Sequence, residues 1–229
     1  MNIILTGASQ GIGYELTKKF IQDKHQVVAI ARSRKKLQQL ENELNSESLY
    51  CFEFDLLTVD YQESLVPFVK EHFTKVDILI NNAGVLINKP IKELTDGDFD
   101  QLFHVNVKSA FKLTRELLPL FNKDAHIVNI SSMGGVQGSI KFRGLSLYSA
   151  SKAALSVLTE CLAEELKELN IKVNALALGA VQTEMLAKAF PNYKAPLQAG
   201  EMASFIADFA INGAHYFNGK IIPVSTTTP

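Results

Sequence analysis

Tyr148 and Lys152 are the two residues whose types and spacing most directly suggest chemistry. They stand four residues apart within 147–169, a segment rich in Ala, Leu and Glu that we expect to be helical, so the two side chains share one face. A free tyrosine has a pKa of about 10 and is a poor proton shuttle at neutral pH. A cation about 4 Å away contributes about 4 kcal/mol at an effective dielectric constant near 20, enough to lower a phenol pKa by about 2–3 units. The pair therefore predicts a general acid and base that exchanges a proton with a carbonyl or alcohol oxygen.

The Tyr-x-x-x-Lys spacing occurs three times in the chain, so the spacing alone identifies no site. Tyr14 begins one further pair inside the first expected helix, and Tyr216 begins another across an Asn-Gly turn, so we expect both on the surface. Tyr148 differs because Ser132 follows a strand upstream and small residues surround the tyrosine. Small side chains allow a ligand to approach the helix closely, which favours Tyr148 as the reactive phenol.

A glycine loop near the start of the chain predicts a phosphate site. Gly7, Gly11 and Gly13 lie between an expected strand at 3–5 and an expected helix at 11–23, with the spacing Gly-x-x-x-Gly-x-Gly. Glycines let the backbone turn tightly and approach a pyrophosphate, which the N–H groups at the helix start then bind. The alternative is an ordinary strand-to-helix loop, and the position directly after the first strand favours the phosphate site.

The end of the second expected strand, 26–30, bears on which dinucleotide binds. A carboxylate at this position binds the ribose 2′-hydroxyl of NAD, whereas an arginine suits the 2′-phosphate of NADP. The strand is followed by Ala31, Arg32 and Ser33, with no acidic residue. Because a guanidinium pairs with phosphate through two hydrogen bonds, we predict NADP(H) in preference to NAD(H), with Arg32 as the main contact and Ser33 beside it. The alternative is that Arg32 is a solvated residue at a helix start.

Strand-like and helix-like segments alternate from one end of the chain to the other. The strands are continuous apolar runs, which is typical of a parallel sheet buried on both faces. We therefore expect a doubly wound (Rossmann) α/β fold, with a seven-stranded parallel sheet, helices on both faces and a single domain over residues 1–229. The expected strands are 3–5, 26–30, 49–54, 76–80, 126–130, 171–178 and 220–224, and the expected helices include 11–23, 34–45, 60–72, 98–122 and 147–169.

Composition restricts the kind of protein. The 229 residues are 47% hydrophobic and 21% charged with a formal net charge of −1, as in an ordinary globular domain. Lys and Arg are spread along the chain, so we expect neither nucleic acid nor a membrane as partner. Five widely spaced histidines predict no metal site, and Cys51 and Cys161 are expected to be buried structural thiols. Since no apolar run approaches the roughly 18 residues of a membrane span and no export signal is apparent, the expected compartment is the cytoplasm.

Together these motifs resemble the short-chain dehydrogenase/reductase family, in the family's order and over nearly the whole chain. They are Thr6 with the glycine loop, Asn81-Asn82-Ala83-Gly84, Asn106 within His104-Val105-Asn106-Val107, Asn129-Ile130-Ser131-Ser132, and Tyr148-Ser149-Ala150-Ser151-Lys152. The match is specific for the family and unspecific for the substrate.

The resemblance implies a role for each catalytic residue, namely Asn106, Ser132, Tyr148 and Lys152. Ser132 would hydrogen-bond the substrate oxygen, with Ser131 on the opposite face of the strand. Tyr148 would be the acid and base. Lys152 would lower the Tyr148 pKa and bind the nicotinamide ribose, and Asn106 would hold a water molecule in the proton relay.

The resemblance also implies the cofactor site and the assembly. Asn82, Ala83 and Gly84 would line the cofactor, and Asp55 with Leu56 would face the adenine. The full expected cofactor-binding set is Gly7, Ser9, Gln10, Gly11, Ile12, Gly13, Arg32, Ser33, Asp55, Leu56, Asn82, Ala83, Gly84, Tyr148, Lys152, Gly179, Val181 and Thr183. A homodimer or homotetramer would form through the helices at about 98–122 and 147–169.

Several features depart from the family pattern. Leu178-Gly179 stands where Pro-Gly is common, the interval 133–147 is long and carries Lys141, Phe142 and Arg143, and the segment after Thr183 is short. The usual glycine-rich ending is replaced by residues 225–229. These departures leave the substrate shape and the tetramer contacts open. Met185, Leu186 and Phe190 either line an apolar pocket or only close over it, and Lys141 with Arg143 is either an attractor for an acidic substrate or part of a solvated loop.

The residues and the resemblance together predict an NADP(H)-dependent oxidoreductase acting on a small carbonyl or alcohol substrate. A 3-oxoacyl-thioester reductase is one specific possibility, and a reductase of small ketones, pteridines or sugars is another. The alternative from a different class is a catalytically silent NADP-binding regulatory protein with the same fold. The intact set of four catalytic residues argues against that alternative.

Overall fold

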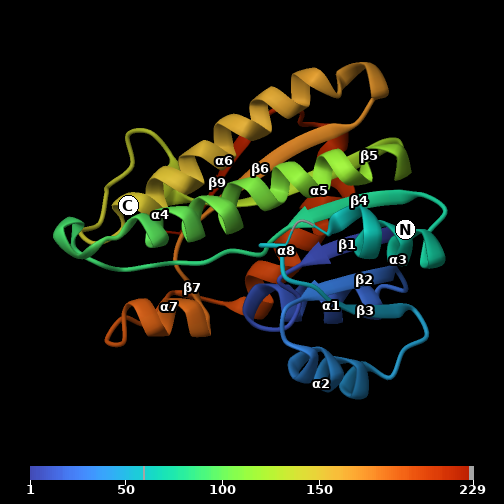
Figure 1. Ribbon diagram of the computed structural model, residues 1–229, viewed down its shortest axis with the longest axis horizontal. Helices are drawn as coiled ribbons and strands as arrows, with labels where there is room; N and C mark the ends of the chain where they lie inside the picture. The colour runs from blue at the N-terminus through green and yellow to red at the C-terminus, as the bar shows by residue number, and fades with distance from the viewer. Residues whose placement is uncertain (59, 227–229) are drawn as a thin grey trace.

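The computed structural model describes residues 1–58 and 60–226 (Figure 1). Seven strands form one parallel sheet in the order β3-β2-β1-β4-β5-β6-β9. These strands are β1 (Asn2–Thr6), β2 (Gln26–Ala31), β3 (Leu49–Glu53), β4 (Val76–Asn81), β5 (Phe121–Ser132), β6 (Lys172–Leu178) and β9 (Ile221–Val224). The predicted number of strands and their parallel direction are confirmed. Thr227, Thr228 and Pro229, the last part of the unusual ending, lie outside the described residues.

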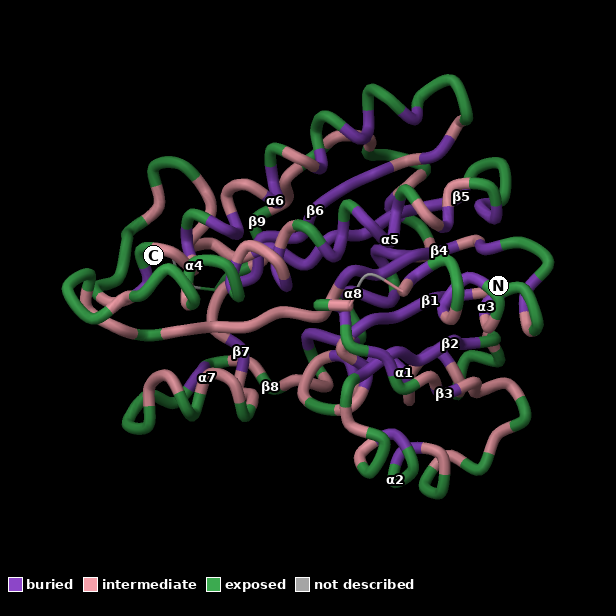
Figure 2. Tube along the Cα trace, in the orientation of Figure 1, coloured by how far each residue is buried: buried purple, intermediate pink, exposed green. Residues whose placement is uncertain are grey.

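Helices cover both faces of the sheet, as predicted for a doubly wound fold. Helices α1, α2 and α8 pack on one face, and α3, α5 and α6 pack on the other. Figure 2 shows why the strands are continuous apolar runs, since the sheet is the most deeply buried layer of the molecule. The helices are α1 (Gly11–Gln22), α2 (Arg34–Leu44), α3 (Val66–His72), α4 (Asp96–Phe103), α5 (Ser109–Leu117), α6 (Ser146–Glu165), α7 (Glu184–Ala189) and α8 (Ala199–Asn212).

The order of the strands reverses between β1 and β4. From β1 the chain continues outward to β2 and β3, and it then returns to place β4 on the other side of β1. The helices that follow these two strands leave in opposite directions, which opens a crevice at the carboxyl ends of the strands. The residues directly after β1 and β4 are therefore the ones that the topology brings to a ligand.

The long helix predicted over 98–122 is found as a continuous helical stretch over 96–120, but a π-helical turn divides it and it ends before residue 121. Helix α4 ends at Phe103, a π-helical turn occupies His104–Lys108, and α5 ends at Leu117. Beyond the short 3-10 turn Leu118–Leu120, the chain is already extended in β5. A π-helical turn inserts one extra residue, which turns the side chains after it relative to those before it and often marks a functional site. Apolar periodicity does not register one inserted residue.

A second small sheet was not predicted either. β7 (Val181–Gln182) pairs with β8 (Leu197–Gln198), and α7 lies between them. In Figure 1, α7 lies below the main sheet, at the lower left. Strands of two residues are too short to give a periodic pattern, so nothing local in the sequence indicates them.

Buried polar side chains tie the layers together. Asn81 on β4 donates to Asn129 on β5 at 2.8 Å, and Asn129 donates in turn to Thr159 on α6 at 2.9 Å. On the far side of β5, His126 is buried between the carbonyl of Ala210 and the amide of Asn174, and its burial lowers its pKa to about 4. These groups fix α6 and α8 against the sheet that carries the site.

The cysteine prediction was half right. Cys51 is buried, and its burial raises the pKa of the thiol to about 12, whereas Cys161 is exposed on the outer face of α6.

In the part of the chain that the structure describes, no group of three or more His, Cys, Asp or Glu could hold a metal ion. None of the helices described is both long enough and apolar enough to cross a bilayer.

Candidate active site

One cavity of about 560 Å³ opens at the carboxyl ends of the strands. Every expected cofactor-binding residue lines it, from Gly7 in the first loop to Thr183 before α7, and so do the expected catalytic residues Ser132, Tyr148 and Lys152. Asn106 is the exception, because it lies behind the wall of the cavity. The structure therefore brings together residues that are as much as 176 positions apart, while the role of each remains a prediction.

The glycine loop is shaped by close backbone approach. A Cβ atom at Gly13 would lie 2.2 Å from the carbonyl oxygen of Gly7, and Gly7 itself has a φ of +68°. Larger residues fit neither the contact nor the left-handed backbone. The loop is therefore a bare backbone surface, the form that a pyrophosphate requires.

Helix α1 presents an open, positively polarised end to this loop. Its N-cap residue, Gln10, makes no capping hydrogen bond through its side chain, and the first turn contains no acidic residue. The N–H groups at the start of a helix have no partners within the helix and carry partial positive charge. The residues thus fit an anionic phosphate group at this point.

Four hydrogen bonds join the segment after β4 to Thr6 and Gly7, where β1 leads into the glycine loop. One of them runs from the Asn82 side chain to the carbonyl of Gly7 at 3.3 Å. The side chain of Asn82 donates to the carbonyl of Thr6 at 3.0 Å, and the hydroxyl of Thr6 accepts from the backbone N–H groups of Asn82 and Ala83 at 3.1 and 3.0 Å. These bonds join the two strands at which the strand order reverses. They hold both walls of the crevice at a fixed separation.

At the far end of the cavity, β2 is followed by exposed Arg32 and by Ser33. The hydroxyl of Ser33 caps α2 by accepting from the backbone N–H of Lys36 at 3.3 Å. Ser33 is thus part of the helix start, and Arg32 remains the exposed cation predicted for this position. Asp55 and Leu56 line the same end, as expected for residues beside an adenine.

The predicted catalytic residues meet at the end of β5. Tyr148 and Lys152 come from the first two turns of α6, and the Ser132 side chain hydrogen-bonds the Tyr148 phenol. The ammonium of Lys152 lies 6.0 Å from the centre of the Tyr148 ring and donates to the carbonyl of Ile130 at 2.8 Å. Ser131 faces the other way, donating to the backbone carbonyl of Lys152 at 2.9 Å, so it holds the helix against β5.

The electrostatics of this group differ from the prediction. Burial raises the pKa of Tyr148 above its ordinary value, and the hydrogen bond from Ser132 opposes this increase. The expected lowering of the Tyr148 pKa by Lys152 is not found, and burial lowers the pKa of Lys152 itself to about 8. At neutral pH the phenol is therefore protonated beside a cation, which is the form that donates a proton.

Asn106 cross-links the wall behind the catalytic residues. Its side chain donates to the carbonyl of Val85 at 3.0 Å and to the hydroxyl of Ser151 at 2.9 Å, and accepts from the N–H of Val85 at 2.8 Å. The residue sits within the π-helical turn, only 2% exposed. Both N–H groups of the side chain are used in these bonds, so the amide joins the segment after β4 to α6, and the water-holding role stays a prediction.

Comparison with known proteins agrees with this geometry. The family model described as short chain dehydrogenase matches residues 1–194. The chain belongs to the short-chain dehydrogenase/reductase family. An uncharacterised oxidoreductase from Staphylococcus aureus (strain USA300) is 27% identical over 223 residues, covering 96% of this chain and 95% of the relative.

Two solved structures from Brucella melitensis extend the likeness to the fold. A short-chain dehydrogenase/reductase of the glucose/ribitol dehydrogenase type has a TM-score of 0.89 at 26% identity, covering 98% of this chain and 94% of the other. A 3-ketoacyl-(acyl-carrier-protein) reductase complexed with NADH has a TM-score of 0.88 at 25% identity, with 98% and 96% coverage. Short-chain dehydrogenases use nicotinamide cofactors, and a cavity built around a glycine loop and an open helix end fits such a cofactor.

In this short-chain dehydrogenase, a close contact leaves no room for a side chain at Gly179. A Cβ atom at Gly179 would lie 2.4 Å from the hydroxyl oxygen of Ser225, and the Gly179 N–H donates to the carbonyl of Val224 at 2.9 Å. The segment after β9 thus packs directly against the turn after β6.

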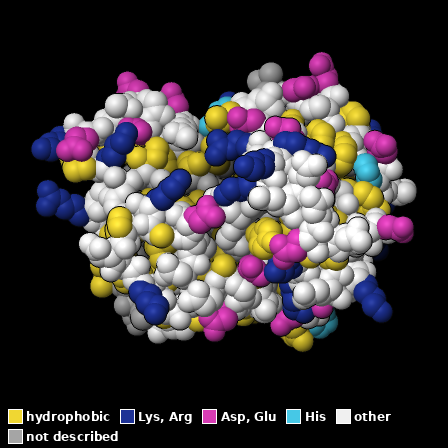
Figure 3. Space-filling model, turned by 90° about the horizontal axis from the view of Figure 1, so that it is seen from below, with side chains coloured by type: hydrophobic (Ala, Val, Ile, Leu, Met, Phe, Trp, Pro, Cys, Tyr) yellow, Lys and Arg dark blue, Asp and Glu magenta, His cyan; other side chains and the backbone are white. Residues whose placement is uncertain are grey.

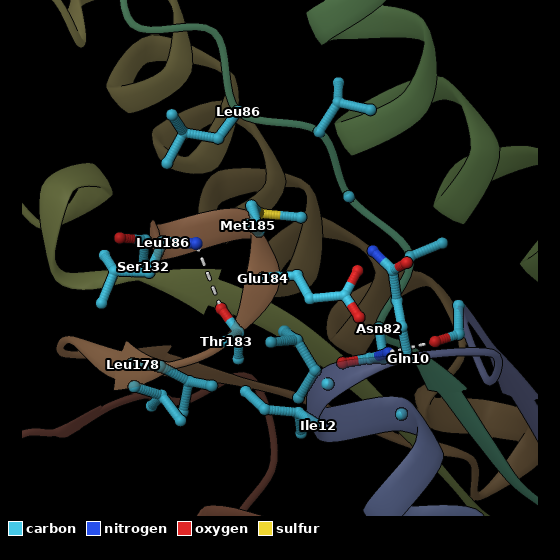
Figure 4. Close-up of a pocket in the computed structure, with 18 of the residues that line it drawn as sticks. Gln10, Ile12, Asn82, Leu86, Ser132, Leu178, Thr183, Glu184, Met185 and Leu186 are labelled. Atoms are coloured by element: carbon cyan, nitrogen blue, oxygen red, sulfur yellow. Dashed lines mark hydrogen bonds between the residues drawn. The ribbon is translucent and has the colours of Figure 1, made fainter. Parts of the chain in front are cut away.

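Thr183, further along the chain, caps α7 by accepting from the N–H of Leu186 at 3.2 Å, as drawn in Figure 4.

The other end of the cavity is apolar. Met185, Leu186 and Phe190, which were undecided from the sequence, all line it. Sequence reasoning missed several further apolar lining residues, among them Leu86, Leu145 and Tyr193, and placed Phe142 only in a long loop. No local pattern marks these residues, because they come from three separate segments that meet only in the folded chain. Figure 4 shows Leu86 above Met185, with Ser132 to one side.

Sequence reasoning also missed Lys36 and Glu184, which line the cofactor end. The position of Lys36, four residues after Arg32 and in the first turn of α2, is a signal that could have found it. Glu184 offered no signal, because its contact with α2 spans 148 residues.

Proposed function

We propose that residues 1–229 form one domain and that this short-chain dehydrogenase is an NADP(H)-dependent oxidoreductase that interconverts a carbonyl group and an alcohol. The observation that carries the proposal is that the Tyr148 phenol, hydrogen-bonded to Ser132, shares one cavity with the glycine loop. A proton donor thus lies in the same space as the surface that fits a dinucleotide.

The chain's own residues would hold the substrate oxygen and supply the proton. When bound, the nicotinamide supplies the hydride. The hydroxyl groups of Ser132 and Tyr148 would both donate to the carbonyl oxygen, and Tyr148 would transfer its proton to that oxygen as negative charge develops there. The raised pKa of Tyr148 keeps the phenol protonated at neutral pH, so it would be ready to donate its proton when the carbonyl is reduced. Lys152 would bind the ribose and place a positive charge beside the phenolate that remains.

The preference for NADP(H) rests on the residues at the end of β2. Arg32 lines the cavity there, and no carboxylate occupies the position that would bind a ribose 2′-hydroxyl. An arginine side chain would bind the 2′-phosphate through paired hydrogen bonds. The related Brucella reductase was solved with NADH, so the preference is a property that we propose for this chain.

The substrate would bind an apolar surface with its carbonyl group at Ser132 and Tyr148. Leu86, Leu145, Met185 and Leu186 line this end, which suits the hydrocarbon part of a ketone or of a 3-oxoacyl thioester. The name of the related 3-ketoacyl reductase supports the second choice.

We further propose a homodimer or homotetramer located in the cytoplasm. Phe111 on α5 and Val157 on α6 are 39% and 58% exposed, and Phe99 on α4 is 45% exposed, so the helices implicated by the family carry apolar groups on their outer sides. Both cysteines are free thiols, as a reducing compartment would keep them.

Loss of NADPH absorbance with a panel of ketones, aldehydes and 3-oxoacyl thioesters tests the enzyme assignment. Tyr148→Phe should lower kcat by about 10²–10⁴-fold while the dissociation constant of NADPH stays within about twofold. Tyr14→Phe is a matched control, because Tyr14 has the same spacing to a lysine but contacts Glu43 outside the cavity. NADPH binding without turnover of any panel member would instead favour the regulatory protein.

A further inference from the structure

A single lysine connects three segments around the cofactor end of the cavity. The ammonium of Lys36, in the first turn of α2, contacts the side-chain oxygen of Gln10 in the glycine loop at 2.6 Å. It also contacts the carboxylate of Glu184, the first residue of α7, at 3.2 Å. All three residues line the cavity. Figure 4 shows the Glu184 carboxylate directed toward Gln10 and Asn82, across the space between α7 and the glycine loop.

Lys36 is placed next to the position expected for a ribose 2′-substituent. Its backbone N–H is capped by Ser33, and it follows Arg32 by four residues, so one cation precedes α2 and the other lies in the first turn of that helix. Arg32 takes part in no ion pair among the described residues, whereas Lys36 is already paired with Glu184. Two cations, Arg32 and Lys36, thus line this end of the cavity, and Glu184 is the carboxylate that pairs with Lys36.

We propose that Lys36 and Glu184 act together to select the phosphorylated dinucleotide: Lys36 exchanges the Glu184 carboxylate for the 2′-phosphate, and Glu184 opposes that exchange. This inference rests on the NADP(H) preference of the proposed function and deepens it. Lys36 becomes a second phosphate-binding cation, and Glu184 sets how strongly the 2′-phosphate is favoured.

The energies of the two pairings favour this exchange. The side chains of Lys36 and Glu184 are 37% and 63% exposed, and exposed pairs of this kind contribute only about 0–1 kcal/mol. A phosphate monoester carries a charge of about −1.5 to −2 at pH 7 and offers three acceptor oxygens. Two cations binding it outweigh one weak pair with a single carboxylate. A ribose 2′-hydroxyl has no charge to offer Lys36, so NAD would leave the Lys36–Glu184 pair in place.

Calorimetric titration with NADP⁺ and NAD⁺ tests the proposal without any turnover. Lys36→Gln should weaken NADP⁺ binding about tenfold, since hydrogen bonds to charged groups contribute about 1.5–3 kcal/mol and this one is partly exposed. NAD⁺ binding should change by less than about twofold. Glu184→Gln should have the opposite sign and tighten NADP⁺ binding about threefold, again with little effect on NAD⁺. In the double variant the Glu184 effect should shrink, because its partner is gone.

Two controls isolate the site. Arg34→Gln removes a neighbouring cation of α2 that pairs with Glu41 and does not line the cavity, so both dissociation constants should stay as in the wild type. Lys36→Arg should restore most of the NADP⁺ affinity. Equal NADP⁺ affinity in Lys36→Gln and the wild type, or no gain in Glu184→Gln, overturns this inference while the enzyme assignment stands. A wild-type protein that binds NAD⁺ as tightly as NADP⁺ overturns the proposed cofactor preference itself.

Discussion

The cofactor end and the substrate end of the same cavity are built in different ways. The cofactor end is a backbone surface formed by the glycine loop, which hydrogen bonds from Asn82 and Thr6 tie to β4. The substrate end is a set of apolar side chains, carried by α7, by the segment after β4 and by the loop before α6. One end is fixed by backbone geometry, and the other is defined by the size and shape of replaceable side chains.

This difference shows which part of the site can vary. A pyrophosphate is the same in every nicotinamide dinucleotide, so a rigid surface with no side chains serves it, and the strands that bear that surface are the most deeply buried. Substrates differ, and short segments at the surface can change without disturbing the sheet. Figure 3 shows several Lys and Arg side chains gathered in the upper middle of one outer face, with Asp and Glu side chains around them.

Gly13→Ala should weaken NADPH binding more than the other changes discussed below, and its effect should be confined to the cofactor end. The new Cβ atom would lie 2.2 Å from a backbone oxygen and 2.6 Å from the Asn82 amide nitrogen, and neither wall can yield without breaking the link to β4. We expect NADPH to bind up to about a hundredfold more weakly, since overpacking a rigid contact costs about 1–3 kcal/mol. Calorimetry measures the change.

Gly97→Ala is the matched control, because a Cβ atom there would meet only the Thr95 hydroxyl at 3.7 Å. Its NADPH affinity should equal that of the wild type. Normal affinity in a folded Gly13→Ala variant would show that the cofactor end is not fixed by its backbone.

The same contrast explains what the sequence could predict. The glycine loop, the segment from Asn82 to Gly84 and the Tyr148/Lys152 pair are local patterns, and all of them line the cavity. Parallel strands buried on both faces also leave a local signal, so the sheet was predicted with its number of strands. The π-helical turn at Asn106 and the contact from Lys36 to Glu184 depend on an inserted residue and on a partner 148 positions away, which periodicity cannot detect.

The reaction should depend on pH through Lys152 at the junction of the two ends. Burial lowers its pKa to about 8, so the ammonium is present below pH 8 and is lost as the pH rises through that value. The Tyr148 phenol, whose pKa is raised, stays protonated over the same range. We expect kcat/KM for NADPH in the reduction to be level up to about pH 8 and then to fall about tenfold per pH unit.

A variant of the apolar end should keep that pH profile, because Leu186 carries no charge and lies apart from the ammonium. A profile that stays level to pH 9.5 in the wild type would mean that Lys152 is not needed as a cation. Initial rates at saturating carbonyl substrate, with buffers of constant ionic strength, provide the measurement.

Leu186→Ala should raise the KM of an apolar carbonyl substrate about fivefold. Burying a whole leucine side chain contributes roughly 1.5–3 kcal/mol, and the half-buried Leu186 would contribute part of that to substrate binding. NADPH affinity should be unchanged, which is the converse of Gly13→Ala. Leu169→Ala, at a 51% exposed position that does not line the cavity, is the control. An equal loss of NADPH affinity in Leu186→Ala would mean that the two ends are not separable.

Asn88→Ala should give the smallest effect and shows how the substrate end is held. The Asn88 side chain donates to the carbonyl of Ala189 at the end of α7 at 2.9 Å, and it lies against Gly144, where a Cβ atom would be 2.1 Å from its oxygen. Three segments of the substrate end are thus joined through the single exposed amide of Asn88. At the cofactor end, by contrast, several hydrogen bonds join the walls of the cavity. Loss of one such hydrogen bond corresponds to about 0.5–1.5 kcal/mol, so we expect a KM about threefold higher with kcat and NADPH affinity unchanged.

Asn122→Ala is the control: it removes a comparable exposed hydrogen bond to Asp77, at 2.9 Å, away from the cavity and should leave KM as in the wild type. If both variants behave alike, side-chain shape rather than the Asn88 link holds the apolar end in place.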